Sequence, residues 1–116
     1  INYFYEEASG RIYFHGAGEG HKIDAIRRCD KVSFNVHDAG VKLEGDWAYT
    51  VRSVTVFGRL HILEDRDRAM ALLRQIGLKY YPSVEEVDQV MERAASRVTM
   101  LELVPEHITG KRVHEK

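Results

Sequence analysis

A loop with three glycines lies between two segments rich in β-forming residues, and it carries residue types that bind anions. Gly16, Gly18 and Gly20 alternate with other residues, and His21 and Lys22 follow directly. Glycine lets a backbone approach a ligand closely. A helix that begins after the loop would offer free N–H groups and the positive end of its dipole to a negative charge. The pattern therefore predicts a phosphate site in which Lys22 supplies a full positive charge.

A dinucleotide fold is the main alternative, because the strand, loop, helix and next strand are followed by Asp38 at about the expected distance. The glycine spacing is G-x-G-x-G rather than G-x-G-x-x-G, however, and the remaining chain lacks an alternating strand–helix pattern. A P-loop is excluded because the loop contains no Gly-Lys-Ser or Gly-Lys-Thr. The interpretation that the glycines merely form a turn without any ligand is not excluded. The position of Lys22 argues against that interpretation, because a cation in the first helical turn opposes the helix dipole and a bound anion would explain its placement.

The composition argues against several classes of function. Lys and Arg number 17 against 18 Asp and Glu, so the net charge of −1 gives no electrostatic case for binding nucleic acid. No apolar run approaches the roughly 18 residues of a membrane span. The six histidines lack the spacing of a metal site, and neither Ser33 nor Ser53 has a base beside it. Cys29, the single cysteine, is expected to be small and buried, and a reducing, cytoplasmic compartment fits best.

Hydrophobic periodicity divides the 116 residues into the strands and helices of one domain. Strands are expected at residues 1–6, 11–15, 32–36, 48–63 and 97–104, and helices after residue 20, after Asp65 and after Ser83. The order is therefore β-β-α-β-β-α-α-β, mostly with short connections. This order predicts a mainly β (α+β) fold, namely a small antiparallel barrel with helices packed outside.

Glycines and prolines set further expectations. Gly58 lies inside the longest strand pattern and predicts a bulge or bend, as at a barrel corner. Residues 37–46 are polar and predict a surface loop. Pro105 is expected to stop the last strand, and residues 108–111 to form a turn before a mobile tail.

With these residues laid out, the sequence resembles the FMN-binding split-barrel superfamily of pyridoxamine 5'-phosphate oxidase-like proteins. The branch that it resembles most is the nitroimidazole-resistance-type flavoproteins. Four groups of segments carry the resemblance, in order along nearly the whole chain: residues 12–17 with 20–22, residues 31–36, Tyr49 with 52–54 and 57–59, and residues 79–82 with 108–111. The implied fold is a small antiparallel split β-barrel with flanking helices. Family members have a further strand or hairpin before the position of Ile1, so residues 1–116 are expected to be one FMN-binding domain that lacks it.

The resemblance also implies a homodimer with FMN at the subunit interface and a small-molecule substrate, without nucleic acid or membrane partners. The cofactor-binding residues that it implies are Tyr13, Phe14, His15, Gly16, His21, Lys22, Tyr49, Arg52 and Ser53. Lys22 and His21 would hold the phosphate, which Arg52 would also reach, and Ser53 would hydrogen-bond the cofactor. His15 is the one candidate catalytic residue. Vitamin B6 oxidation is not expected, because the arginines that bind the substrate phosphate in the oxidase have no evident counterpart here.

The function that follows from the resemblance is an FMN-dependent oxidoreductase. It would pass electrons from a reduced donor to a small organic acceptor, such as a nitro compound. The cofactor performs such chemistry and the protein positions it, which agrees with the lack of a clear catalytic constellation. Two alternatives stay open: a flavin carrier or sensor without turnover, and a haem-binding split-barrel protein.

Overall fold

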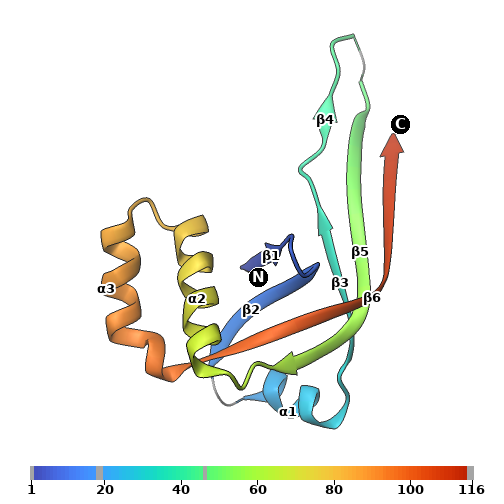
Figure 1. The fold of residues 1–116 in the computed structure, drawn as a ribbon. Helices are drawn as coiled ribbons and strands as arrows, with labels where there is room; N and C mark the ends of the chain where they lie inside the picture. The colour runs from blue at the N-terminus through green and yellow to red at the C-terminus, as the bar shows by residue number, and fades with distance from the viewer. Residues whose placement is uncertain (1, 18–19, 46, 115–116) are drawn as a thin grey trace.

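The computed structural model describes residues 2–17, 20–45 and 47–114. Figure 1 shows a bent antiparallel sheet with two helices at the left and a third helix below the sheet. The elements are β1 (Tyr3–Glu6), β2 (Arg11–Ala17), α1 (His21–Arg28), β3 (Lys31–His37), β4 (Val41–Lys42), β5 (Tyr49–Ile62), α2 (Arg66–Tyr80), α3 (Val84–Ala94), a 3-10 turn (Ala95–Arg97) and β6 (Val98–His114). None of the helices in the described ranges has the length and apolar character needed to cross a membrane.

All the strands pair antiparallel, in the order β1-β2-β6-β5-β3, and β4 continues beyond β3 along the same edge of β5. The two longest strands, β5 and β6, pair from Thr50 with His114 to Ile62 with Leu101. The predicted fold class, an antiparallel split barrel of the α+β type, is confirmed.

Two apolar cores lie on opposite faces of the sheet, because successive residues of a strand point to opposite sides. Tyr13 and Met100 pack against α2, whose buried face consists of Ala69, Leu72, Leu73 and Ile76. Phe14 lies on the other face, where it packs with Ile23 of α1 and with Leu103. The four buried residues of α2 recur at the spacing of one helix face.

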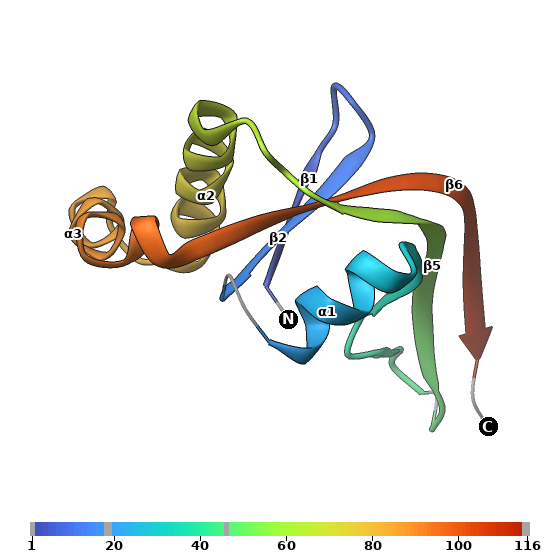
Figure 2. The ribbon, with the colours of Figure 1, turned by 90° about the horizontal axis from the view of Figure 1, so that it is seen from below.

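The sheet bends at a bulge in the middle of β5 and β6. Phe57 pairs with His107 and Gly58 with Pro105, so Glu106 is the extra residue. The bulge predicted at Gly58 is confirmed, but the expectation that Pro105 ends the last strand is wrong. Proline lacks an N–H for the ladder, and a bulge is a place where a strand tolerates that loss. The strand therefore continues to His114, and Figure 2 shows both strands turning sharply at this corner.

Two segments predicted to be irregular belong to the sheet. Residues 108–111 pair with β5 instead of forming a turn. The predicted loop at residues 37–46 contains the end of β3 and all of β4, with Asp46 outside the described residues. Asp38 holds this segment beside β5, because its carboxylate accepts hydrogen bonds from the N–H groups of Gly40 and Arg52 at 3.0 and 3.1 Å.

Beyond the bulge, an arm projects from the rest of the molecule, and it consists of β4, the first half of β5 and the second half of β6 (Figure 1). The molecule measures 51 × 37 × 28 Å, and its radius of gyration of 16.9 Å exceeds the roughly 13 Å of a compact chain of this length. Large apolar side chains are exposed on and beside the arm: Val41, Leu43, Trp47, Tyr49, Val54, Phe57 and Ile108. So much exposed apolar surface is typical of an interface.

The outer edge of the sheet at β1 is held by the end of α2. Lys79 Nζ donates to the carbonyl oxygen of Tyr3 at 2.9 Å and lies 3.6 Å from the centre of the Tyr3 ring. The N–H of Tyr3 donates to the hydroxyl of Tyr80 at 3.3 Å. Side chains of α2 therefore satisfy the outward-facing backbone groups of this residue.

Candidate functional site

The first turn of α1 is open to a ligand. Gly20 precedes the helix with a φ of 133°, which favours glycine, and no side chain within the described residues caps the helix. The other two helices begin differently, because the side chains of Asp65 and Ser83 accept hydrogen bonds from the N–H groups of Arg68 and Glu86. The N–H groups at the start of α1 thus point out of the helix without such a partner.

Lys22 brings a positive charge to this open helix end. Both His21 and Lys22 are exposed in the first turn of α1. Lys22 also lines a cavity of about 330 Å³ between α1 and the sheet, together with Phe14, Phe34 and Lys31. Lys31 was not among the site residues predicted from the sequence, although its position at the start of the strand after α1 could have suggested it.

His15 lies on the opposite face of β2 from this cavity. Its Nδ1 atom is buried and has no hydrogen-bond partner among the described residues. Burial lowers the pKa of His15 below its usual value, so the ring is neutral at neutral pH. The neutral imidazole can donate or accept one hydrogen bond at Nδ1.

The end of β2 has a free edge. Strand β1 pairs only with residues 11–14 of β2, whereas β6 pairs with residues 12–17. Along His15, Gly16 and Ala17, one edge of β2 therefore has no strand partner within the part of the chain that the structure describes. A Cβ added at Gly16 would meet nothing within 4 Å, so there is space beside it.

The side chains of Tyr13 and Phe14 are buried in the two cores, so only their backbone could approach a cofactor. Tyr13 is fully buried, and its hydroxyl donates to Oε2 of Glu102 at 2.9 Å and accepts from Nη2 of Arg68 at 2.8 Å. Phe14 stacks edge-on against Phe34, with 4.9 Å between the ring centres. Their predicted place at the cofactor stays a prediction.

Tyr49, Arg52 and Ser53 lie on the arm, apart from the other predicted site residues. Arg59 pairs with Lys31 near α1, and Arg52 is seven residues further along β5, or roughly 23 Å at about 3.3 Å per residue. Arg52 and Ser53 also point to opposite faces of the strand. His15 and Gly16 thus lie before the glycine loop and His21 and Lys22 after it, whereas the three residues of the arm lie apart from both pairs.

A polar cluster that was not predicted from the sequence lies at the end of α1. Arg59 Nη1 donates to Oδ1 of Asp30 at 2.7 Å, and the His61 ring lies 3.1 Å from Oδ2 of Asp30. The hydrogen bond from Arg59 lowers the pKa of Asp30. Cys29, next to this cluster, was expected to be buried but is exposed, because it is the C-cap of α1 and its backbone is extended beyond the last helical residue. No group of three metal-ligating side chains occurs in the described ranges.

A bent antiparallel sheet with outer helices, and a glycine loop that opens onto an uncapped helix bearing a lysine, define a protein of the split-barrel class. More particularly, the chain belongs to the pyridoxamine 5'-phosphate oxidase family, whose model matches residues 1–112. The family predicted from the sequence is confirmed. No curated protein matches the chain.

Solved structures of similar fold include three bacterial proteins. A proposed 5-nitroimidazole antibiotic resistance protein from Bacteroides thetaiotaomicron is 21% identical, with a TM-score of 0.73 over 99% of this chain and 68% of its own. A conserved hypothetical protein from Mycobacterium tuberculosis is 19% identical, with a TM-score of 0.71 over 87% of this chain and 60% of its own. An FAD-binding protein from Mesorhizobium loti is 23% identical, with a TM-score of 0.61 over 96% of this chain and 72% of its own. The chain thus spans between 60% and 72% of the length of these proteins.

Proposed function

We propose that this protein binds FMN and is an oxidoreductase that passes electrons from a reduced donor to a small organic acceptor. The observation that carries the proposal is the uncapped first turn of α1 with Lys22 beside it. Helix N–H groups and a lysine together suit a phosphate monoester. Membership of the family and the FAD-binding protein of similar fold support a flavin as the molecule that carries the phosphate.

Within this proposal, flavin supplies the electron chemistry when bound, and the chain binds and positions it. Lys22 and the N–H groups of α1 hold the phosphate, with His21 beside them. The free backbone edge of His15 and Gly16 offers hydrogen-bonding groups to the polar side of a ring. His15 also stays the candidate catalytic residue.

The proposal is tested by reconstitution. The purified protein is incubated with FMN or FAD, passed over a desalting column and examined by visible absorption. FMN should remain bound, and NADH or NADPH added under nitrogen should bleach its absorbance, which a nitroaromatic acceptor should restore. Protein without any flavin absorbance would refute the proposal. If flavin binds but neither donor reduces it, the result would favour the alternative of a flavin carrier without turnover.

Replacing Lys22 with alanine should weaken FMN binding about tenfold, because one charged contact to the phosphate is lost. The dissociation constant is measured by quenching of flavin fluorescence. Arg28→Ala is the matched control, since it removes one positive charge from the opposite end of the same helix. Equal effects of the two substitutions would show that the affinity for FMN depends only on net charge, and that Lys22 does not contact the phosphate.

We further propose a homodimer in which the arm of one subunit supplies Tyr49, Arg52 and Ser53 to the flavin site of the other. The support is the separation of these residues from Lys22 within one chain and the exposed apolar surface of the arm. A two-fold dimer uses the same patch on both subunits, so it would cover both arms and complete both sites.

Ile108→Asp tests the dimer, because Ile108 is 57% exposed on the arm and a buried carboxylate would be costly there. The variant should be monomeric by light scattering at concentrations where the unaltered protein is a dimer, and it should lose flavin. Val84→Asp, at a position 51% exposed on α3, is the control and should change neither property. A variant that stays dimeric would place the interface elsewhere.

A further inference from the structure

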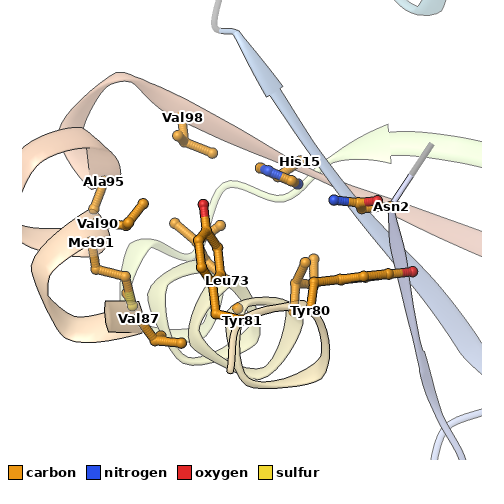
Figure 3. Close-up of a pocket in the computed structure, with 12 residues that line it drawn as sticks. Asn2, His15, Leu73, Tyr80, Tyr81, Val87, Val90, Met91, Ala95 and Val98 are labelled. Carbon is orange, nitrogen blue, oxygen red and sulfur yellow. The ribbon is translucent and has the colours of Figure 1, made fainter. Parts of the chain in front are cut away.

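A second cavity lies on the face of β2 opposite the cavity at Lys22. It has a volume of about 140 Å³ and is bounded by α2, α3 and the ends of β2 and β6. Figure 3 shows aliphatic side chains of the two helices around it, with His15 of β2 above. A cavity of about 150 Å³ lined by apolar side chains can hold a single benzene ring, so this one has room for a molecule of that size.

The lining of the cavity is mostly aliphatic, with Leu73, Val87, Val90 and Met91 among its members. None of its lining residues, all of them in the described ranges, is a Lys, Arg, Asp or Glu. A charged ligand would therefore lose its water without gaining an opposite charge. The lining selects for an uncharged, largely apolar molecule.

Polar groups gather at one end of the cavity, where Figure 3 shows the Tyr81 hydroxyl and the Asn2 amide on either side of the His15 ring. Nδ1 of this ring is buried and has no partner among the described residues. A hydrogen bond from a ligand to a polar group at this end would add affinity and fix the orientation of the ligand. An apolar pocket with a few convergent polar groups is the usual form of a small-molecule site.

The backbone of β2 separates this cavity from the one at Lys22. Phe14 lines the cavity at Lys22 and His15 lines the second cavity, because neighbouring residues of a strand face opposite sides. None of the residues proposed to hold the flavin phosphate lines the second cavity. Binding in it can therefore be measured without flavin.

We propose that this cavity binds a small, uncharged molecule with one ring, whose single hydrogen-bonding group meets the imidazole ring of His15. The aliphatic side chains of α2 and α3 hold the ring, and the histidine fixes its direction. The site goes beyond the proposed flavin function, although it shares His15 with the residues predicted for the cofactor, and the flavin-free titrations below test it separately.

The test uses flavin-free protein and ¹⁹F NMR titrations with three probes: 4-fluorophenol, fluorobenzene and 4-fluorobenzoate. 4-Fluorophenol should bind best, and fluorobenzene about tenfold more weakly, as expected for the loss of one hydrogen bond. 4-Fluorobenzoate should not bind, because the cavity offers no cation to it. Equal binding of all three probes, or of none, would overturn the inference.

Two variants locate the binding. His15→Leu should reduce the affinity for 4-fluorophenol to that for fluorobenzene, because it removes the polar atom and keeps an apolar wall. Val90→Phe should abolish binding of both by filling the cavity from a half-buried position that tolerates a larger side chain. Lys22→Ala is the control and should leave 4-fluorophenol binding unchanged. If neither cavity variant affects the titrations, the probes bind elsewhere and the inference fails.

Discussion

Replacing Gly58 with alanine is expected to destabilise the protein by about 3 kcal/mol or more. A Cβ at this position would overlap the carbonyl oxygen of Val104 and lie 3.0 Å from the Cα of Pro105. Both neighbours are backbone atoms of β6, so no side chain can rotate away to make room. Relief requires the two strands to separate at the bulge, where the sheet turns its corner.

The free energy of unfolding is measured by urea denaturation of the variant and the unaltered protein. Gly110→Ala is the matched control, because Gly110 lies inside β6, the strand that pairs with β5, and a Cβ there would meet nothing within 4 Å. The control should change the stability by no more than about 0.5 kcal/mol. Similar effects of the two substitutions would mean that the cost arises from the loss of glycine in a strand and not from the close approach at the bulge.

Removing the hydroxyl of Tyr13 is the second change with a large expected effect. Tyr13→Phe should destabilise the protein by about 2 kcal/mol, because the hydroxyl joins two charged groups in a buried place. Glu102 is only 9% exposed, and without the Tyr13 hydroxyl it would keep its 3.3 Å ion pair with Arg11. Arg68 would keep its ion pair with Glu6 at 3.0 Å.

The same denaturation experiment measures the loss, and Tyr5→Phe on β1 is its control, since Tyr5 is 49% exposed. That variant should be within about 0.5 kcal/mol of the unaltered protein. A double variant, Tyr13→Phe with Glu102→Gln, should lose less than the sum of its two single changes, because the two side chains share one hydrogen bond. Strict additivity would contradict the coupling.

The features predictable from the sequence were those fixed by local chemistry. Asp65 and Ser83 are recognisable caps because a short acceptor side chain precedes an amphipathic run, and both form the expected bonds. The buried face of α2 follows from helical spacing alone. Gly58 was identifiable as a bulge because few other roles suit a glycine inside a long strand.

Features that depend on distant parts of the chain could not be predicted in the same way. Pro105 is an ordinary strand terminator until Gly58, 47 positions earlier, is known to pair with it at a bulge. Strand β4 has only two residues, and it depends on Asp38 bonding to Arg52 across the hairpin. Such pairings carry no periodic signal in the sequence.

The candidate site shows the same division between local features, which can be read from the sequence, and features that depend on distant residues. The loop and Lys22 are close in sequence, so local spacing locates them together at the start of α1, and their role as an anion site stays a prediction. The cavity at His15 is different, because its walls come from β2, β6 and both long helices, and no local pattern indicates that they meet. Which residues of the arm would face the second subunit proposed above likewise depends on contacts beyond one chain.

The contacts of α2 with β1 also protect the sheet from unwanted growth. An edge strand with free N–H and C=O groups is a template on which another chain can pair and begin to aggregate. At Tyr3 these groups are taken by Tyr80 and Lys79, and the ammonium group of Lys79 places a charge at the edge. An approaching strand would have to displace two side chains and break a cation–π contact. The end of α2 therefore hinders the addition of another strand at this edge of the sheet.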